Sequence, residues 1–194
     1  MQSNPNLLAI CASLKPAPGR TEPSACREIL RAATAYLSRV VPNIESLDLR
    51  NATLPGFEGL APAHHYDPAV MQVHQRIRAA SGLIFSIPAY WGGVGGAFKA
   101  FVELVCGPSY ENASSSPFQG KPAVALLVGS DAFSTQSAIS QLDSIFEAIG
   151  VHLTSELVVV PNPAATGASD AAIRALIGAS AQLAQHVIKV KEGA

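Results

Sequence analysis

The sequence predicts an α/β protein built on a doubly wound, five-stranded parallel sheet with strand order 2-1-3-4-5 and helices on both faces. Short apolar runs alternate with longer stretches of helical character, and right-handed crossovers leave few other topologies for that alternation. The central runs are nearly continuously hydrophobic, as in strands that are covered on both faces. With 194 residues, 48% of them hydrophobic and 14% charged, the chain is expected to form one domain over residues 1–194.

The expected elements follow a regular rhythm along the chain. Each strand is a short apolar run, and several of these runs are rich in β-branched residues. Two long connections, 50–67 and 107–122, are rich in Pro, Gly, Ser or Asn, which is typical of functional or interface loops. In order, the expected elements are strand 7–12 (LLAICA), helix 22–40, strand 44–49 (IESLDL), helix 68–81, strand 82–87 (GLIFSI), helix 95–106, strand 123–128 (AVALLV), helix 134–149, strand 153–160 (LTSELVVV) and helix 169–191.

Charge and cysteine content exclude several classes of function. A net charge of -1 with no run of Lys or Arg disfavours binding to nucleic acid or to an anionic membrane surface. The first apolar run reads as a strand rather than a signal peptide, and no window has transmembrane character, so we expect a cytoplasmic protein. The three cysteines, Cys11, Cys26 and Cys106, lack metal-binding spacing and are expected to be buried, so no metal site is predicted.

The predicted strand order reverses between the first and third strands, and ligands bind such sheets where the strands end at that reversal. The loop after the first strand, residues 13–24 (SLKPAPGRTEPS), places hydroxyls and cations immediately before a helix. Hydroxyl donors, cations and the N-terminus of a helix together suit a phosphate. An ordinary helix-capping role for the later hydroxyls stays open. The candidate phosphate contacts are Ser13, Lys15, Arg20, Thr21 and Ser24.

The stretch after the third strand contains four glycines in five positions beside Tyr90 and Trp91. Its lysine does not follow a glycine, which excludes a Walker A loop, and Phe98 occupies the third glycine position of a dinucleotide-binding fingerprint. We interpret the run as a site for a flat ring, which the backbone of Gly92 and Gly93 can approach while the aromatic side chains wall it. A purely structural turn is the alternative. The next helix presents a core face formed by Phe98, Phe101, Val102 and Val105.

These motifs resemble a known family. PAYWGGVGGAFK (88–99) is similar, without a gap, to the P-x-Y-x-G-x-x-x-G-x-L-K segment of the NADPH-dependent FMN reductase family. SLK (13–15) resembles the S-x-R phosphate loop of that family, and GKPAVALLVGS (120–130) resembles its entry into the fourth strand with the flavin loop that follows. The resemblance covers nearly the whole chain in order. It implies a flavodoxin-like fold, bound FMN and a homo-oligomer.

The resemblance also implies a set of FMN-binding residues. Ser13 and Lys15 would hold the phosphate, with the other hydroxyls of that loop as helpers. The sequence departs from the family pattern in carrying Ala12 for Gly, Lys15 for Arg, a longer loop over 16–20, and Trp91 where a small polar residue such as Asn is common. The residues that would line the isoalloxazine ring are Pro88, Ala89, Tyr90, Trp91, Gly92 and Gly93 on one side and Gly129 and Ser130 on the other.

The expected function is that of an FMN-dependent oxidoreductase that takes a hydride from NADPH or NADH and reduces a flavin, a quinone or another small acceptor. No catalytic side chain is predicted, because the flavin carries out the bond making. A biosynthetic flavoprotein oxidoreductase and a flavodoxin-type electron carrier are alternatives, but 14 acidic against 13 basic residues lack the strong acidic surface typical of carriers. A flavin-free scaffold is a third class. Low charge and a mean hydropathy of +0.26 favour a homodimer or homotetramer.

Overall fold

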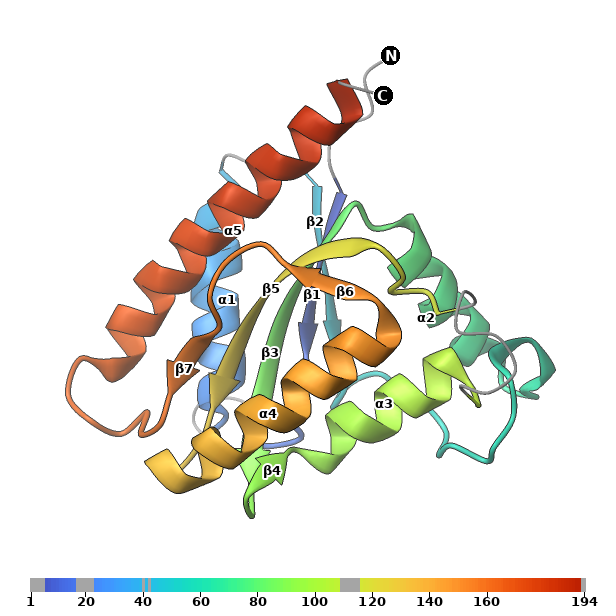
Figure 1. Cartoon of the computed structure of the whole chain (residues 1–194), viewed down its shortest axis with the longest axis horizontal. Helices are drawn as coiled ribbons and strands as arrows, with labels where there is room; N and C mark the ends of the chain where they lie inside the picture. The colour runs from blue at the N-terminus through green and yellow to red at the C-terminus, as the bar shows by residue number, and fades with distance from the viewer. Residues whose placement is uncertain (1–5, 17–22, 40, 42, 109–115, 193–194) are drawn as a thin grey trace.

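A computed structural model describes residues 6–16, 23–39, 41, 43–108 and 116–192. Parallel strands form a central sheet in the order β2-β1-β3-β5-β6, with helices on both of its faces (Figure 1). The predicted order 2-1-3-4-5 is therefore confirmed for the main path of the sheet. The strands are β1 (Asn6–Cys11), β2 (Asn43–Asp48), β3 (Gly82–Tyr90), β4 (Gly93–Val94), β5 (Lys121–Val128), β6 (Val151–Leu153) and β7 (Val158–Val160).

The predicted fifth strand, 153–160, is wrong as a continuous element. It is replaced by β6 and β7, which both pair with β5 in parallel. Leu153 pairs with Ala123 and Val158 with Leu126, so two extra residues lie between the paired segments on the edge strand. The backbone N–H of Thr154 still donates to the Ala123 carbonyl at 2.8 Å before the chain leaves the pairing. An edge strand has a partner on one side only, so such an insertion breaks few ladder hydrogen bonds.

The third strand is longer than predicted and turns back as a hairpin. It extends to Tyr90, and β4 pairs with it antiparallel through Ala89 with Val94 and Tyr90 with Gly93. The two connecting residues, Trp91 and Gly92, both have positive φ, +50° and +77°. Two central residues with positive φ are the signature of a type I′ turn, which matches the twist of the flanking strands. The hairpin projects at the carboxyl end of β3 (Figure 1).

The helices begin and end at recognisable capping residues. Ser24, Asp67 and Asp131 cap α1, α2 and α4 by accepting a backbone N–H through the side chain. Because Ser24 is the cap, α1 begins at residue 25 rather than at the predicted 22. Gly150, with φ +77°, ends α4 in the left-handed conformation. The helices are α1 (Ala25–Leu37), α2 (Pro68–Ala79), α3 (Gly96–Cys106), α4 (Ala132–Ile149) and α5 (Ala168–Glu192), with a short 3₁₀ helix, η1 (Pro62–His64), before α2.

Two hydrophobic clusters lie on opposite faces of the sheet. The side chains of α1 and α5 pack on one face, and those of α2, α3 and α4 pack on the other. Phe85 of β3 lies at the centre of the second cluster, where its ring centroid is 5.9, 6.1 and 5.2 Å from those of Phe98, Phe118 and Phe146. The predicted core face of α3 is confirmed, because Phe98, Phe101, Val102 and Val105 are all buried.

Cys11 and Cys26 are buried as predicted, whereas Cys106 is half-buried. Burial raises the pKa of the Cys26 thiol to about 12, so that thiol stays protonated at neutral pH.

Within the described ranges, no group of three or more His, Cys, Asp or Glu side chains is arranged to hold a metal ion. None of the helices described here is both long enough and apolar enough to cross a membrane.

Candidate functional site

A cavity lies at the edge of the sheet where β1, β3 and β5 end. Its volume is about 120 Å³, ample for several atoms of a ligand. The reversal of strand order between β1 and β3 leaves this gap, since the chain leaves these two strands toward opposite faces. Seven residues that the sequence singled out line the cavity: Ser13, Lys15, Ser24, Pro88, Tyr90, Gly129 and Ser130.

Two buried hydroxyls give the cavity its polar character. Ser13 and Ser24 are each only 1% exposed. The Ser13 hydroxyl accepts the backbone N–H of Lys15 at 3.3 Å, and the Ser24 hydroxyl accepts the backbone N–H of Arg27 at 3.2 Å. Both oxygens therefore act as acceptors toward the protein, which leaves each hydroxyl proton to donate to a ligand. Ser24 also stands at the N-terminus of α1, where the helix dipole favours an anion.

The capping role that the sequence left open for Ser24 is confirmed, and it is compatible with a phosphate contact. The other predicted members of this loop, Arg20 and Thr21, lie outside the described residues. On the strand side, Ala89 is fully buried within β3. The hairpin residues Trp91, Gly92 and Gly93 stand beyond Tyr90 and are not among the residues that line the cavity.

The glycines of the hairpin approach other parts of this chain. A β-carbon on Gly93 would lie 2.7 Å from Gln141 Oε1, and that oxygen accepts the backbone N–H of Val94 at 3.2 Å. A β-carbon on Gly95 would lie 2.7 Å from Cγ of Pro88 and 3.1 Å from its carbonyl oxygen. Gly92 has positive φ, which only glycine adopts without strain. Backbone conformation thus accounts for Gly92 and the contact with Pro88 accounts for Gly95, whereas the exposed Gln141 side chain could move away from a β-carbon at position 93. An approach of these glycines to a flavin ring stays a prediction.

The loop after β5 forms the opposite wall of the cavity. The Ser130 hydroxyl donates to Asp131 Oδ2 at 2.9 Å, and the backbone N–H of Ser134 donates to Asp131 Oδ1 at 2.7 Å. The Ser134 N–H and then the Ser130 hydroxyl lower the pKa of the Asp131 carboxyl. The loop is anchored to the sheet as well, because the Gly129 N–H donates to the Val160 carbonyl at 2.9 Å. This wall is therefore held in place before any ligand binds.

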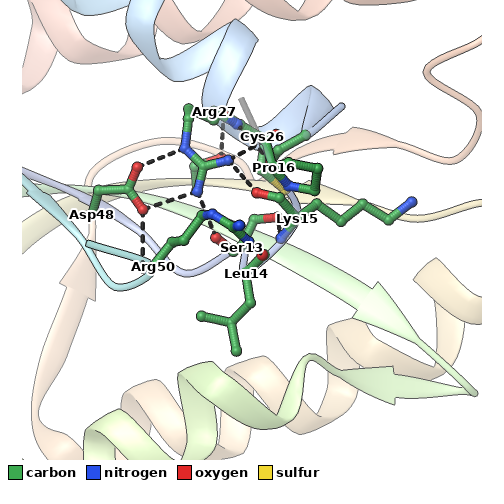
Figure 2. Close-up of polar contacts among 10 residues, drawn as sticks. Ser13, Leu14, Lys15, Pro16, Cys26, Arg27, Asp48 and Arg50 are labelled. Atoms are coloured by element: carbon green, nitrogen blue, oxygen red, sulfur yellow. Dashed lines mark hydrogen bonds and ion pairs between the residues drawn. The ribbon is translucent and has the colours of Figure 1, made fainter. Parts of the chain in front are cut away.

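Sequence reasoning missed three charged residues beside the cavity. Arg27 of α1 pairs with Asp48 at the end of β2, with Nε to Oδ2 at 2.6 Å and Nη2 to Oδ1 at 3.0 Å (Figure 2). The hydrogen bond to Asp48 is the chief cause of the raised pKa of the Arg27 guanidinium. Arg50 lies two residues beyond Asp48 and donates to the Leu14 carbonyl. No sequence pattern pointed to these residues, because an arginine within a predicted helix and an acidic residue at the end of a predicted strand are usually solvated surface residues.

Trp91 lowers the stability of the fold in two ways, through an exposed apolar side chain and through a left-handed backbone conformation. Its side chain is fully exposed, and its φ of +50° places a bulky residue in the left-handed region. The left-handed conformation costs a non-glycine residue roughly 1–2 kcal/mol, and Asn tolerates it better than most residues. Trp91→Asn is expected to raise the free energy of unfolding by about 1 kcal/mol, measured by urea denaturation. Trp91→Ala is the control, since it removes the indole but lacks the short polar side chain that lets Asn tolerate the left-handed conformation; an equal gain in both variants contradicts the strain argument.

Comparison with known proteins identifies the family of this chain. The chain matches the family model described as NADPH-dependent FMN reductase over residues 5–165. It is 28% identical over 151 residues to an NAD(P)H-dependent FMN reductase of Pseudomonas aeruginosa, an alignment that covers 77% of this chain and 78% of that protein.

Solved structures with low sequence identity share the fold. An oxidoreductase from Corynebacterium diphtheriae superposes with a TM-score of 0.72 at 14% identity, over 96% of this chain and 99% of the other. FerB, a flavoenzyme NAD(P)H:(acceptor) oxidoreductase from Paracoccus denitrificans, superposes with a TM-score of 0.65 at 15% identity, over 95% and 98%. The family model covers most of the sequence, so the resemblance drawn from the glycine and phosphate-loop motifs is confirmed. The chain belongs to the NADPH-dependent FMN reductase family and is a flavoprotein oxidoreductase that uses FMN, with NAD(P)H as electron donor.

Proposed function

We propose that the cavity at the ends of β1, β3 and β5 holds the phosphate of FMN. One observation carries this proposal: two buried serine hydroxyls, the N-terminus of α1 and Lys15 converge on a single cavity. Each of these groups donates hydrogen bonds or carries positive charge, which is the chemistry that a phosphate dianion requires. Arg20 and Thr21, in the same loop, are proposed as additional contacts.

The ring of the flavin is proposed to extend from the cavity along the carboxyl edge of the sheet. Pro88 and Tyr90 stand on one wall of the cavity, and Gly129 and Ser130 stand on the other. The hairpin residues 91–93 would continue the first wall, and the buried Ala89 would support it from within β3. The bound flavin supplies the hydride-transfer chemistry. The residues of this chain bind the phosphate, fix the ring between two anchored loops and leave the outer side open to reactants.

A small, flat electron acceptor suits the outer side of the site. Tyr90 is 39% exposed, Trp91 is fully exposed and Phe133 is 76% exposed. The turn and Phe133 are neighbours, since a β-carbon on Gly92 would lie 3.7 Å from the Phe133 ring. Exposed aromatic rings can stack on the conjugated ring of a flavin or quinone acceptor or of the nicotinamide donor. We propose Trp91 as the residue that walls this acceptor side.

The organisation of the protein is also part of the proposal. Residues 1–194 are proposed to form one FMN-binding domain, because one sheet carries both hydrophobic clusters. Low net charge and positive mean hydropathy support a homodimer or homotetramer, and the lack of a basic run argues against nucleic-acid or membrane partners. A cytoplasmic location stays a prediction from the sequence.

The phosphate site is tested by removing its donors. The double variant Ser13→Ala with Lys15→Ala is expected to weaken FMN binding by about 1.5 to 3 kcal/mol, the scale of hydrogen bonds to charged groups. Riboflavin, which lacks the phosphate, should bind both proteins equally. Fluorescence titration of the apoprotein with each flavin provides the measurement.

A matched control exists on the surface of the same protein. Lys99 and Ser144 lie on α3 and α4 and do not line the cavity, and their bonds are local, to Glu103 and to the Ser140 carbonyl. The double variant Lys99→Ala with Ser144→Ala should therefore bind FMN as the wild type does. Unchanged FMN affinity in the Ser13 and Lys15 variant would place the phosphate elsewhere.

A further inference from the structure

In the loop after β1, the carbonyl groups of residues 13–16 each accept a hydrogen bond from an arginine. Arg27 and Arg50 approach residues 13–16 from the side of α1 and β2, and Figure 2 shows the Arg27 guanidinium between Asp48 and the loop. Arg27 is not among the residues that line the cavity. The Ser13 carbonyl accepts Arg27 Nη2 at 2.8 Å, the Leu14 carbonyl accepts Arg50 Nη1, the Lys15 carbonyl accepts Arg27 Nη1, and the Pro16 carbonyl accepts Arg27 Nη1 at 3.2 Å.

Asp48 fixes the direction of this arginine. Its carboxylate binds Arg27 through two parallel hydrogen bonds, the fork geometry that orients a guanidinium most strongly. The same carboxylate accepts the backbone N–H of Arg50 at 3.1 Å. The side chains of Arg27 and Asp48 are 13% and 20% exposed, so solvent screens their pairing only in part. The end of β2 is thus joined to the first turn of α1 across the loop.

The engaged carbonyls determine where the N–H groups of the loop point. A peptide unit is planar and trans, so a carbonyl drawn toward an arginine directs the N–H of the same unit to the opposite side. The Leu14 carbonyl turns toward Arg50, and the N–H of the same peptide unit, that of Lys15, donates to the Ser13 hydroxyl, which lines the cavity. The Lys15 N–H therefore holds the Ser13 hydroxyl at the cavity, and the carbonyl oxygens of residues 13–16, which would repel an anion, face the arginines.

We propose that Arg27, oriented by Asp48, is a positioning residue for the phosphate site. It does not contact the ligand; it holds residues 13–16 in the one conformation that presents the Ser13 hydroxyl and the loop to a phosphate. The inference rests on the proposed function, because the phosphate is that of FMN. It adds Arg27 and Asp48 to the residues that phosphate binding requires, although neither lines the cavity.

The sign of the change in FMN affinity distinguishes a direct electrostatic effect of Asp48 from a positioning effect. Asp48 is a negative charge close to the proposed anion site, so removing its charge should tighten FMN binding if the electrostatic field alone matters. If Asp48 acts by orienting Arg27, the variant Asp48→Asn should instead weaken FMN binding, because the guanidinium loses its fixed direction. Arg27→Met should weaken binding under either view.

The experiment compares Arg27→Met, Asp48→Asn and a matched control, Arg76→Met. Arg76 also binds a carboxylate and a carbonyl, those of Glu45 at 3.3 Å and Ser46 at 3.1 Å, but outside this loop. FMN and riboflavin dissociation constants are measured by fluorescence titration, and hydrogen exchange of residues 13–15 is followed in the apoprotein. The preference for FMN over riboflavin is expected to fall about tenfold in Arg27→Met and severalfold in Asp48→Asn. Exchange at the loop should accelerate in both, and Arg76→Met should match the wild type.

The outcomes separate this inference from the function on which it rests. Equal wild-type affinity for FMN and riboflavin would contradict the phosphate site itself. A wild-type preference for FMN that persists in Arg27→Met while loop exchange accelerates would overturn the positioning role alone. Tighter FMN binding in Asp48→Asn would overturn it as well, and that variant keeps the test decisive if Arg27→Met does not fold.

Discussion

Phe85→Ala is expected to lower the free energy of unfolding by about 3 to 5 kcal/mol, the range for deleting a fully buried aromatic side chain. Phe85 is fully buried on the central strand β3, and its ring contacts three other phenylalanine rings from α3, α4 and the segment before β5. Its loss removes apolar burial and leaves a cavity that those rings cannot fill without leaving their own contacts. Urea denaturation of the apoprotein measures the change.

The same substitution at an exposed phenylalanine is the control. Phe133, at the start of α4, is 76% exposed, so Phe133→Ala should change the free energy of unfolding by no more than about 0.5 kcal/mol. A loss below about 1 kcal/mol in Phe85→Ala would mean that the cluster collapses around the deletion, against the packing described here.

Gly95→Ala is expected to lower the free energy of unfolding by about 3 kcal/mol, toward the upper end of the range for overpacking. The new β-carbon would lie 2.7 Å from Pro88 Cγ and 3.1 Å from the Pro88 carbonyl oxygen. Neither group can swing aside, because Pro88 belongs to β3 and its carbonyl accepts the Gly95 N–H at 2.7 Å. The substitution therefore strains the junction between the hairpin and α3, next to the proposed flavin site.

The neighbouring glycine provides a control with identical chemistry. Nothing lies within 4 Å of a β-carbon on Gly96, which is the first residue of α3. Gly96→Ala should leave the stability unchanged or raise it by up to about 1 kcal/mol, the difference in helix propensity. Chemical denaturation of the two variants in parallel decides the matter: equal stabilities would remove the packing explanation for Gly95.

The sequence alone predicted the architecture of this protein, apart from the break in the edge strand and the β3–β4 hairpin. Hydrophobic periodicity located the strands and helices, and the rule that ligands bind where strand order reverses directed attention to the ends of β1 and β3. Residues as distant in sequence as Ser13 and Ser130 line the same cavity because parallel strands bring their carboxyl ends to one edge. The motifs that resemble the FMN reductase family indicated FMN as the cofactor. All of this information is local or topological, so it can be read from one chain.

Only the tertiary structure decided the remaining features, because each depends on contacts between distant residues. The interruption of the edge strand follows from its register with β5, and the hydrogen bond from the Val94 N–H to Gln141 joins the hairpin to α4. A tryptophan in a left-handed turn contradicts local preference and could not be expected. The pair of Arg27 and Asp48 joins residues 21 positions apart through side-chain geometry alone. Periodicity reports which face of an element is buried, but not which partner a polar side chain meets there.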